Sequence, residues 1–414
     1  MVTHVEIDRV PIAPLGFEVR TWRPRSVEHY SNAEVARQTG EYQSAVAPPI
    51  AAWSAHLSGA LAAEVADATR FLIEFDFHAV AQLGKQNPAL GPMSAILLRT
   101  ESSSSSQIEQ LTASAKQLAL AELGEESRAN AATVVGNVRA MEAALRLSAD
   151  LDLVSILAMH RELLTRQPGL EREAGRLRGE LVWIGNRDTA GPRGATFIAP
   201  QHELVQGALD DLVGFMRRDD LPVLVQIAVA HAQFETIHPF VDGNGRTGRA
   251  LAQALLRGKG LATHTTVPLS AGLLTGTEQY FDALEQYRRG DAAPIIQRFC
   301  QASRYAAVTG RSLVDQLAQQ LDASRGRLEG VRPQAAAWRI LPVLIQQPVV
   351  NTSYLMNSLG LSAMTVGRAL DTLVERGVVR EGTGAARRRV WRHPGILDVL
   401  DTYAAEVRRA PRRR

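Results

Sequence analysis

The most informative stretch of the chain reads HPFVDGNGRTGR and spans His238–Arg249. It lies between two segments, 221–236 and 246–257, that the spacing of apolar residues predicts to be helical. Its glycines let backbone N–H groups converge into an anion-binding nest. The helix that begins near Arg246 directs the positive end of its dipole to the same place. The stretch therefore predicts a phosphate-binding site within a mostly α fold.

Four ionisable side chains of this stretch indicate what happens to the phosphate. Arg246 and Arg249 are three residues apart, so they share a helix face and can clamp more than one phosphate. Asp242 offers the single carboxylate that Mg²⁺ commonly combines with phosphate oxygens. Histidine has an ordinary pKa of about 6.5, so His238 can accept a proton from an attacking hydroxyl. Together they fit transfer of a phosphorus-centred group from a nucleotide to an alcohol.

Two other phosphate motifs are excluded. The segment 243–248 matches G-x-G-x-x-G, but a dinucleotide-binding loop follows a strand, and the preceding segment here is predicted to be helical. That loop also needs an acidic residue about 20 positions further on, and 262–270 contains none. A P-loop would need Gly-Lys-Ser/Thr, which this stretch lacks.

The stretch resembles the signature of the Fic family, HxFx(D/E)GNGRxxR, and matches it at every defined position. The resemblance extends over about residues 42–291 and includes YQSAVAPPIA at 42–51 and VWIG at 182–185. Fic proteins have an all-α core with a β-hairpin flap. Most of them transfer AMP from ATP to a Ser, Thr or Tyr hydroxyl of a protein and release pyrophosphate. The resemblance thus implies a protein adenylyltransferase that uses ATP and Mg²⁺.

By this resemblance, His238 deprotonates the target hydroxyl and Asp242 binds Mg²⁺ between the α- and β-phosphates. The glycines and the asparagine form an anion hole, and the two arginines hold the β- and γ-phosphates. The implied nucleotide-binding residues are Gly243, Asn244, Gly245, Arg246, Thr247, Gly248, Arg249 and Tyr280. Tyr280 and Phe281 resemble an aromatic pair beside adenine, and the alternative is that both belong to the core.

A short hairpin is predicted between 179 and 198, because two β-like runs flank a glycine-rich loop. Its first run resembles the Fic flap, which pairs with the target backbone as an added strand. The implied target-binding residues are Val182, Trp183, Ile184 and Gly185. The alternative is an ordinary hairpin.

The segment SSQIEQ at 105–110 fits the inhibitory motif of many Fic proteins, (S/T)xxxE(G/N), except that glutamine stands at its last position. Ser105 and Glu109 are four residues apart and would share a helix face. By the resemblance, Glu109 pairs with Arg249, occupies the γ-phosphate subsite and inhibits the enzyme. The run of five serines is predicted to begin an inhibitory helix over about 103–123. The alternative is a linker followed by a solvated glutamate.

Residues 331–414 are predicted to form a winged helix-turn-helix domain, because helices, a glycine turn and a hairpin follow in that order. This segment holds 14 Arg and 6 acidic residues, so its net charge is +8 and that of the first 330 residues is −5. The candidate contacts to DNA or to a partner are Thr365, Arg368, Arg387, Arg388 and Arg389. The alternative is that the domain packs against a partner protein or a second subunit of a homodimer.

The composition fits a globular protein of two or three domains, with 414 residues, 45% apolar and 21% charged. We predict an N-terminal helical region over 1–125, a Fic core over 126–330, and the winged domain. The single cysteine, Cys300, excludes an internal disulfide and a cysteine-built metal site. No secretory signal is visible, and the longest apolar run, 221–230, is shorter than the ~20 residues of a membrane span. We therefore expect a cytoplasmic protein that does not bind membranes.

Three functional hypotheses stay open from the sequence. The first is an adenylyltransferase inhibited by its own Glu109. The second is the same fold with another reaction, such as UMP or phosphocholine transfer, phosphorylation or removal of AMP, because the position of the donor in its pocket decides the reaction. The third is a DNA-binding regulator whose Fic core senses a nucleotide. The intact GNGRxxR and the inhibitory glutamate favour the first hypothesis.

Overall fold

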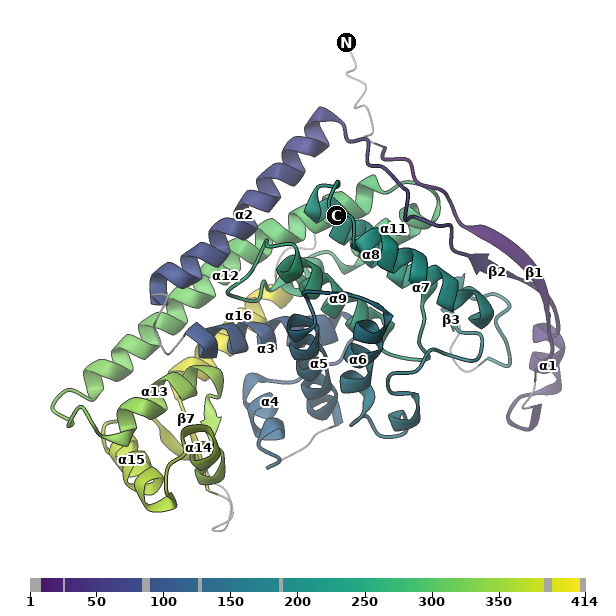
Figure 1. Ribbon diagram of the computed structural model, residues 1–414. Helices are drawn as coiled ribbons and strands as arrows, with labels where there is room; N and C mark the ends of the chain where they lie inside the picture. The colour runs from purple at the N-terminus through teal and green to yellow at the C-terminus, as the bar shows by residue number, and fades with distance from the viewer. Residues whose placement is uncertain are drawn as a thin grey trace. The chain divides into compact units, whose positions relative to one another are not determined.

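The computed structural model describes residues 9–24, 27–83, 90–125, 129–185, 189–382 and 389–409. The fold is mostly α-helical, as predicted (Figure 1). The helices are α1 (Asn32–Gln38), α2 (Gly59–Leu83), α3 (Leu90–Ile108), α4 (Ala115–Glu122), α5 (Ala129–Arg146), α6 (Leu153–Leu164), α7 (His202–Met216), α8 (Val223–Ile237), α9 (Asn244–Gly258), α10 (Leu269–Leu274), α11 (Thr277–Arg288), α12 (Ala293–Arg327), α13 (Ala336–Gln346), α14 (Thr352–Leu359), α15 (Ala363–Glu375) and α16 (Pro394–Arg409). The strands are β1 (Gly16–Trp22), β2 (Gly40–Val46), β3 (Trp183–Ile184), β4 (Phe197–Ile198), β5 (Val349–Val350), β6 (Arg380–Gly382) and β7 (Val390–Arg392). Within the described ranges, no helix has both the length and the apolar character that crossing a bilayer requires.

The chain forms two compact units that are discontinuous in sequence. The first comprises 1–66, 143–259 and 278–299, and the second comprises the rest. The predicted boundaries near 125 and 330 divide the chain linearly instead, so the three-domain organisation stays a prediction. The signature stretch belongs to the first unit, whereas the serine run and the C-terminal elements belong to the second.

Helix α8 forms the centre of the first unit. Every residue from Leu224 to Ile237 is buried, because a helix that is apolar all round needs neighbours on every side. Helices α7 and α9 pack on α8, and α6 packs on α9 (Figure 1). A Cβ at Gly248 of α9 would lie 3.0 Å from the ring of Phe234. Glycine at this position therefore permits the close crossing of α8 and α9.

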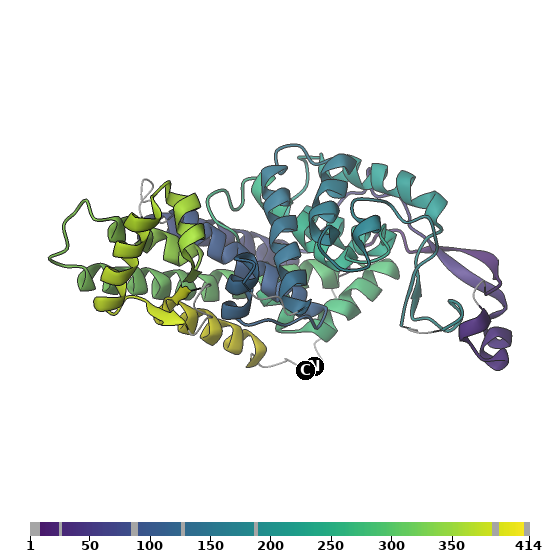
Figure 2. The ribbon, with the colours of Figure 1, turned by 90° about the horizontal axis from the view of Figure 1, so that it is seen from below.

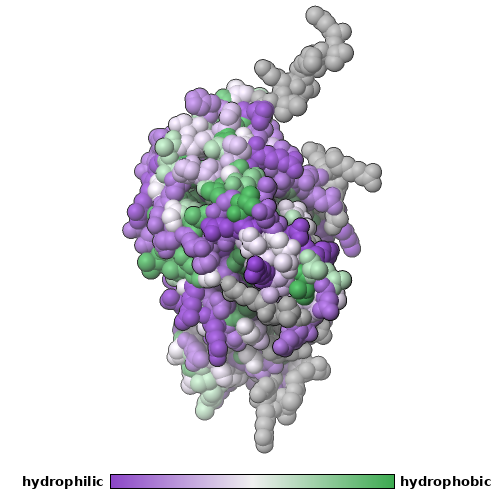
Figure 3. Space-filling model, turned by 90° about the vertical axis from the view of Figure 1, so that its right-hand side faces the viewer, coloured by the Kyte–Doolittle hydropathy of each residue, from purple (hydrophilic) through white to green (hydrophobic). Residues whose placement is uncertain are grey.

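Two antiparallel hairpins accompany this helical core. Strands β1 and β2 pair from Gly16↔Val46 to Trp22↔Gly40, although the sequence predicted no strand in this region. Phe17 and Val19 alternate with Glu18 and Arg20 in β1, but no residue of this strand is buried, so it is not a half-buried strand of the usual kind. Phe17 and Val19 are 62% and 60% exposed. Figure 3 shows the right-hand side of the view in Figure 1, where apolar areas (green) are interrupted by polar ones (purple).

The second hairpin confirms the one predicted between 179 and 198. Strands β3 and β4 pair with the register Trp183↔Ile198 and Ile184↔Phe197. The hairpin is anchored to β2, since the Ser44 hydroxyl donates to the carbonyl of Ala199 at 2.9 Å. The two hairpins of the first unit therefore support each other.

In the second unit, α2 and α12 run parallel and side by side, as both ribbon views show (Figures 1 and 2). Ion pairs join Asp67 to Arg304 at 2.9 Å and Glu74 to Arg311 at 3.1 Å. Helix α2 begins at Gly59, where the Ser58 hydroxyl accepts a hydrogen bond from the N–H of Leu61. Ser58 is thus a helix cap.

The predicted helix over 103–123 is wrong in its bounds. Helix α3 already begins at Leu90 and ends at Ile108, so the serines occupy its last turns. A new helix, α4, begins after Ser114, which forms a capping box with Gln117. Serine is typical of helix starts, but these serines are buried in a helix, where their small side chains permit close packing.

The C-terminal elements follow the predicted order. Helix α14 ends at Gly360, which has a φ of 63°, and α15 begins after its cap, Ser362. Strands β5, β7 and β6 form one antiparallel sheet in that order, and α16 was not predicted. These elements pack against α4, since the buried amide of Gln347 donates to the carbonyl of Ala119 at 2.9 Å. The winged-helix assignment itself stays a prediction.

Candidate functional site

His238 ends α8 in an unusual backbone conformation. Its φ is 50° and its ψ is 61°, in the left-handed region, and its N–H donates to the carbonyl of Phe234 at 3.0 Å. For a non-glycine residue this region costs about 1–2 kcal/mol. The helix stops at the histidine, and a short loop then leads to α9.

The start of α9 is open to an anion. Gly243 is its N-cap, with a φ of 80° and no side-chain cap. A Cβ at this glycine would lie 2.7 Å from Leu163 Cδ2, so both the backbone angle and the available space require glycine. The first helical hydrogen bond runs from the N–H of Thr247 to the carbonyl of Gly243. The preceding N–H groups, including those of Asn244 and Gly245, have no acceptor within the helix, which is the arrangement that an anion nest requires.

Asp242 and Arg246 form an ion pair at this helix start. Arg246 Nη2 donates to Asp242 Oδ2 at 2.8 Å, and Gln167 Nε2 donates to the same oxygen at 3.2 Å. The arginine side chain is 4% exposed, whereas that of the aspartate is 42% exposed. The carboxylate is therefore held by two donors and still faces solvent.

The residues here fit a Mg²⁺ ion whose ligands come partly from the protein and partly from a nucleotide. Mg²⁺ in such sites takes one or two carboxylates and completes its octahedron with phosphate oxygens and waters. Asp242 supplies one exposed carboxylate. In the part of the chain that the structure describes, no group of three or more His, Cys, Asp or Glu residues could hold a metal. A metal held by Asp242 would therefore take its other ligands from phosphate oxygens and waters.

Two side chains hold the loop between the histidine and α9. The amide of Asn244 donates to the carbonyl of Phe240 at 2.8 Å and accepts from its N–H at 2.9 Å. The ring of His160 from α6 stacks on the ring of Phe240, and its Nε2 lies 3.0 Å from the carbonyl of Asp242. His160 Nδ1 accepts from the N–H of Gly175, so Nε2 carries the proton of a neutral ring. Burial lowers the pKa of His160 to about 4, which keeps that ring neutral.

Thr247, Arg249 and Tyr280 are almost completely buried. The Tyr280 hydroxyl lies 2.7 Å from Nε2 of His231. Burial lowers the pKa of His231 to about 3, and the charge of Arg249 acts in the same direction. Phe281 is exposed. Contacts of these residues and of Gly248 with a nucleotide stay predictions, and the structure gives Gly248 a packing role.

The flap residues divide into buried and exposed positions. Val182 and Trp183 are partly buried, and the Trp183 ring makes an edge-to-face contact with Trp22, with 5.5 Å between the centroids. Ile184 and Gly185 are exposed. A cavity of about 610 Å³ lies beside β4. Binding of a target by this hairpin stays a prediction.

Ser105 and Glu109 belong to the second unit. Contrary to the prediction, they do not share a helix face. Ser105 is buried within α3, whereas Glu109 lies in the exposed turn after it. Gln110 has a φ of 62°. Gly or Asn at the last motif position suits such a left-handed helix end, which explains the motif physically. The pairing of Glu109 with Arg249 stays a prediction.

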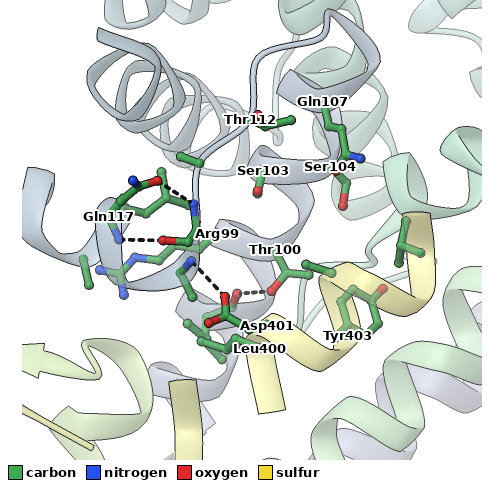
Figure 4. A pocket seen from close by; sticks show the side chains of 18 of the residues that line it. Arg99, Thr100, Ser103, Ser104, Gln107, Thr112, Gln117, Leu400, Asp401 and Tyr403 are labelled. Atoms are coloured by element: carbon green, nitrogen blue, oxygen red, sulfur yellow. Dashed lines mark hydrogen bonds between the residues drawn. The ribbon is translucent and has the colours of Figure 1, made fainter. Parts of the chain in front are cut away.

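The serine run is a packed helical segment rather than a linker. Asn137 Nδ2 of α5 donates to the carbonyl of Ser102 at 2.8 Å and to the Ser106 hydroxyl at 3.2 Å. On another face of α3, Ser103 and Ser104 line a cavity of about 490 Å³, together with residues of α4 and α16 (Figure 4). This cavity lies within the second unit and is not part of the signature site.

The predicted DNA or partner contacts are placed only in part. Thr365 and Arg368 are exposed on α15. Arg389 is also exposed, and its guanidinium donates to both carboxylate oxygens of Glu381, at 2.6 and 2.7 Å. Two of the predicted residues lie outside the described ranges: Arg387 and Arg388. DNA binding stays a prediction.

Three residues that support the site were not predicted: His160, Gln167 and Arg178. Each is distant in sequence from the stretch that it contacts. A histidine within the apolar pattern of α6 was a usable signal for His160. Arg178 had no such signal, because the chain is rich in arginine.

Comparisons with known proteins agree with the geometry. Residues 150–256 match the Fic/DOC family. Protein adenylyltransferase fic-1 of Caenorhabditis elegans is 30% identical over 169 residues, which are 38% of this chain and 30% of that protein. The protein of the same name from Caenorhabditis briggsae is 27% identical over 192 residues, 45% of this chain and 33% of that protein. The chain thus spans about a third of the length of these curated relatives.

A solved structure shows a similar fold. The crystal structure of a Fic family protein from Desulfovibrio desulfuricans superposes with a TM-score of 0.51 and 22% sequence identity. The match covers 82% of this chain and 97% of that one. With the signature loop between α8 and α9 and the hairpin beside it, these findings show that the chain contains a Fic/DOC family domain.

Proposed function

We propose that the chain is a protein adenylyltransferase that transfers AMP from ATP to a Ser, Thr or Tyr hydroxyl of a protein. The observation that carries the proposal is the short loop from His238 to the start of α9. In this proposal His238 is the proton acceptor, and the start of α9 on the same segment of backbone is the phosphate cradle. The names of the relatives favour AMP transfer to protein among the reactions that such a site could perform.

The chemistry follows from these residues. The target hydroxyl attacks the α-phosphorus of ATP, and His238 accepts its proton. The new oxygen–phosphorus bond forms while the bond to the bridging oxygen breaks, and pyrophosphate leaves. The N–H groups at the start of α9 stabilise the charge on the phosphate oxygens. When Mg²⁺ is bound, it neutralises phosphate charge, and Asp242 is the residue that would hold it.

Arg246 has two partners in this proposal. In the structure it pairs with Asp242. With a metal ion held by Asp242, Arg246 would lose this partner and could pair with the β- and γ-phosphates instead. The ion pair thus keeps both groups ordered while the site is empty of nucleotide.

The flap and Glu109 act on substrate access in this proposal. The exposed edge of the hairpin at Ile184 pairs with an extended segment of the target. Glu109 inhibits by pairing with Arg249 and occupying the γ-phosphate subsite.

The C-terminal elements, by the same proposal, form a winged helix that contacts DNA, a protein partner or a second copy of the chain through α15. The exposed Thr365 and Arg368 support a contact there. The single buried cysteine suits a reducing compartment, so a cytoplasmic location is part of the proposal.

The position of a radioactive label tests the reaction. The Glu109→Gly protein is incubated with Mg²⁺ and with ATP labelled on either the α- or the γ-phosphate. We expect the α-label to remain on the protein and the γ-label to leave with pyrophosphate. Chelation of Mg²⁺ should stop incorporation. Retention of the γ-label alone would contradict AMP transfer and identify phosphorylation instead.

A further inference from the structure

One buried guanidinium connects the signature loop to the flap. Arg178 precedes β3 and is 2% exposed. Its Nε donates to the carbonyl of His238 at 2.8 Å, and its Nη2 lies 3.5 Å from the carbonyl of Ile237. Its own backbone N–H donates to the carbonyl of Pro239 at 3.0 Å. Arg178 thus bonds the chain on both sides of the histidine.

The same guanidinium also holds both ends of the flap hairpin. Nη1 donates to the carbonyl of Glu180, just before β3, at 2.8 Å. Nη2 donates to the carbonyl of Pro200, just after β4, at 2.5 Å. The base of the hairpin is closed by a bond from the N–H of Ala199 to the carbonyl of Val182. One side chain therefore fixes the hairpin ends and the end of α8 to each other.

Burial of this charge costs free energy that its contacts have to offset. All the acceptors of the guanidinium are carbonyls, and no carboxylate in the described ranges forms an ion pair with it. Burial lowers the pKa of Arg178 to about 10, so it remains charged at neutral pH. A cation at the C-terminal end of α8 interacts favourably with the helix dipole. The neutral alternatives at this position would leave several buried carbonyls without donors.

The left-handed histidine supplies a reason for this buried arginine. A strained residue persists only when its surroundings fix it. The carbonyls of Ile237, His238 and Pro239 all accept from Arg178, which sets the backbone angles around His238 and hence the direction of its side chain.

We propose that Arg178 is a positioning residue that sets His238 in register with the flap, so that a target held by the hairpin meets the base at the reacting distance. The proposal rests on the adenylyltransferase function proposed above. It predicts that Arg178 affects the rate of transfer and not the affinity for ATP.

The test compares Arg178→Lys and Arg178→Met with a matched control, Arg176→Met, all in the Glu109→Gly protein. Arg176 is an exposed arginine two residues earlier. Each variant is assayed for the maximal rate of AMP incorporation and for the KM for ATP. The histidine ring signals are recorded by NMR, and His238 is assigned by its loss in His238→Ala. Circular dichroism checks that each variant is folded.

We expect both Arg178 variants to lower the maximal rate by about 100-fold, the effect of a misplacement near 1 Å, with an unchanged KM. The His238 ring signal should shift in both, and Arg176→Met should match the parent. Folded Arg178 variants with the parental rate and the parental His238 signal would overturn the proposal. Loss of folding in both would also overturn it, because the arginine would then serve the fold as a whole.

The NMR measurement separates this proposal from the proposed function. If the parent incorporates no AMP, the adenylyltransferase assignment fails. A shifted His238 signal in Arg178→Lys would still show that the arginine positions the histidine, and an unshifted signal would show that it does not.

Discussion

The loop at His238 and the turn at Gln110 have one property in common and otherwise differ. Among the described residues, these two are the only non-glycine residues with positive φ, at 50° and 62°. The buried Arg178 bonds the carbonyls of His238 and Ile237, and the buried His160 bonds the carbonyl of Asp242 further along the loop. Gln110 is exposed, and its N–H donates to the carbonyl of Gln107 in a simple turn. The same backbone strain is thus fixed by its surroundings in one region and held only locally in the other.

This difference is consistent with different functions for the loop at His238 and the turn at Gln110. Strained residues concentrate at functional sites. A strained residue held by buried contacts keeps one geometry, which suits a catalytic base. A strained residue in an exposed turn can relax at small cost, which suits an inhibitory segment that has to move. Substitutions at the loop of His238 should therefore have larger effects than substitutions at the turn of Gln110.

Removing the histidine should have the largest effect. His238→Ala leaves the α9 start and Asp242 in place but removes the proton acceptor, so AMP incorporation should fall by about 10²–10⁴-fold. The rate is measured in the Glu109→Gly protein under saturating ATP, with thermal unfolding as a control for stability. A folded variant with an undiminished rate would show that another group acts as the base.

Removing the carboxylate of Glu109, which we propose to be inhibitory, should raise activity. Glu109→Gly is expected to increase AMP incorporation by about 5- to 150-fold, the range of a coupling free energy of 1–3 kcal/mol. Glu329→Gly is a matched control, because Glu329 also lies in an exposed turn after a helix of the second unit. Equal rates for the parent and Glu109→Gly would remove the turn from the regulation of the enzyme.

Acidification should destabilise the buried region around the loop. The pKa of His160 is about 4 in the folded chain, against an ordinary value of 6.5. The unfolded chain therefore binds a proton first as the pH falls, so the free energy of unfolding decreases between pH 6.5 and about 4 and not above pH 6.5. The expected loss from this group is about 3 kcal/mol at most. His231 and His393 act in the same direction.

The pH dependence is measured by urea unfolding at several pH values. His160→Asn should show a shallower decrease than the parent, because one of the three histidines no longer titrates. An identical slope in both proteins would mean that His160 is not held as the neutral ring between Gly175 and Asp242.

The smallest effect is expected at the exposed turn. Gln110→Gly relieves the left-handed strain and should raise the free energy of unfolding of the second unit by about 1 kcal/mol or less, since the more flexible unfolded chain offsets part of the gain. The readout is the urea midpoint. A decrease would indicate that the glutamine side chain makes contacts that outweigh the strain.

The contrast between the two regions also explains what the sequence could predict. The signature loop was readable because its glycines, asparagine and charged residues have few other uses in that order, and the structure places them at one helix start. The short hairpin at 179–198 was readable from its β-like runs. Serines, in contrast, suit helix caps, linkers and tight packing equally well, and here they pack inside α3.

The remaining features depend on contacts between distant segments. Strands β1 and β2 are separated by an intervening helix, and the apolar residues of β1, Phe17 and Val19, are exposed. His160, Gln167 and Arg178 act on a loop that lies 60 to 82 residues away in sequence. Tyr280 is buried and bonded to His231, and its place beside adenine stays a prediction. Apart from the histidine within the apolar pattern of α6, these contacts have no local sequence signal.

The central claim is AMP transfer to a hydroxyl group, and intact mass spectrometry tests it most directly. The Glu109→Gly protein is incubated with ATP and Mg²⁺, with the Glu109→Gly/His238→Ala protein as its control. We expect the Glu109→Gly protein to gain the mass of one or more adenylyl groups and the Glu109→Gly/His238→Ala protein to gain none. A gain of phosphoryl groups, or the same gain in both proteins, would contradict it.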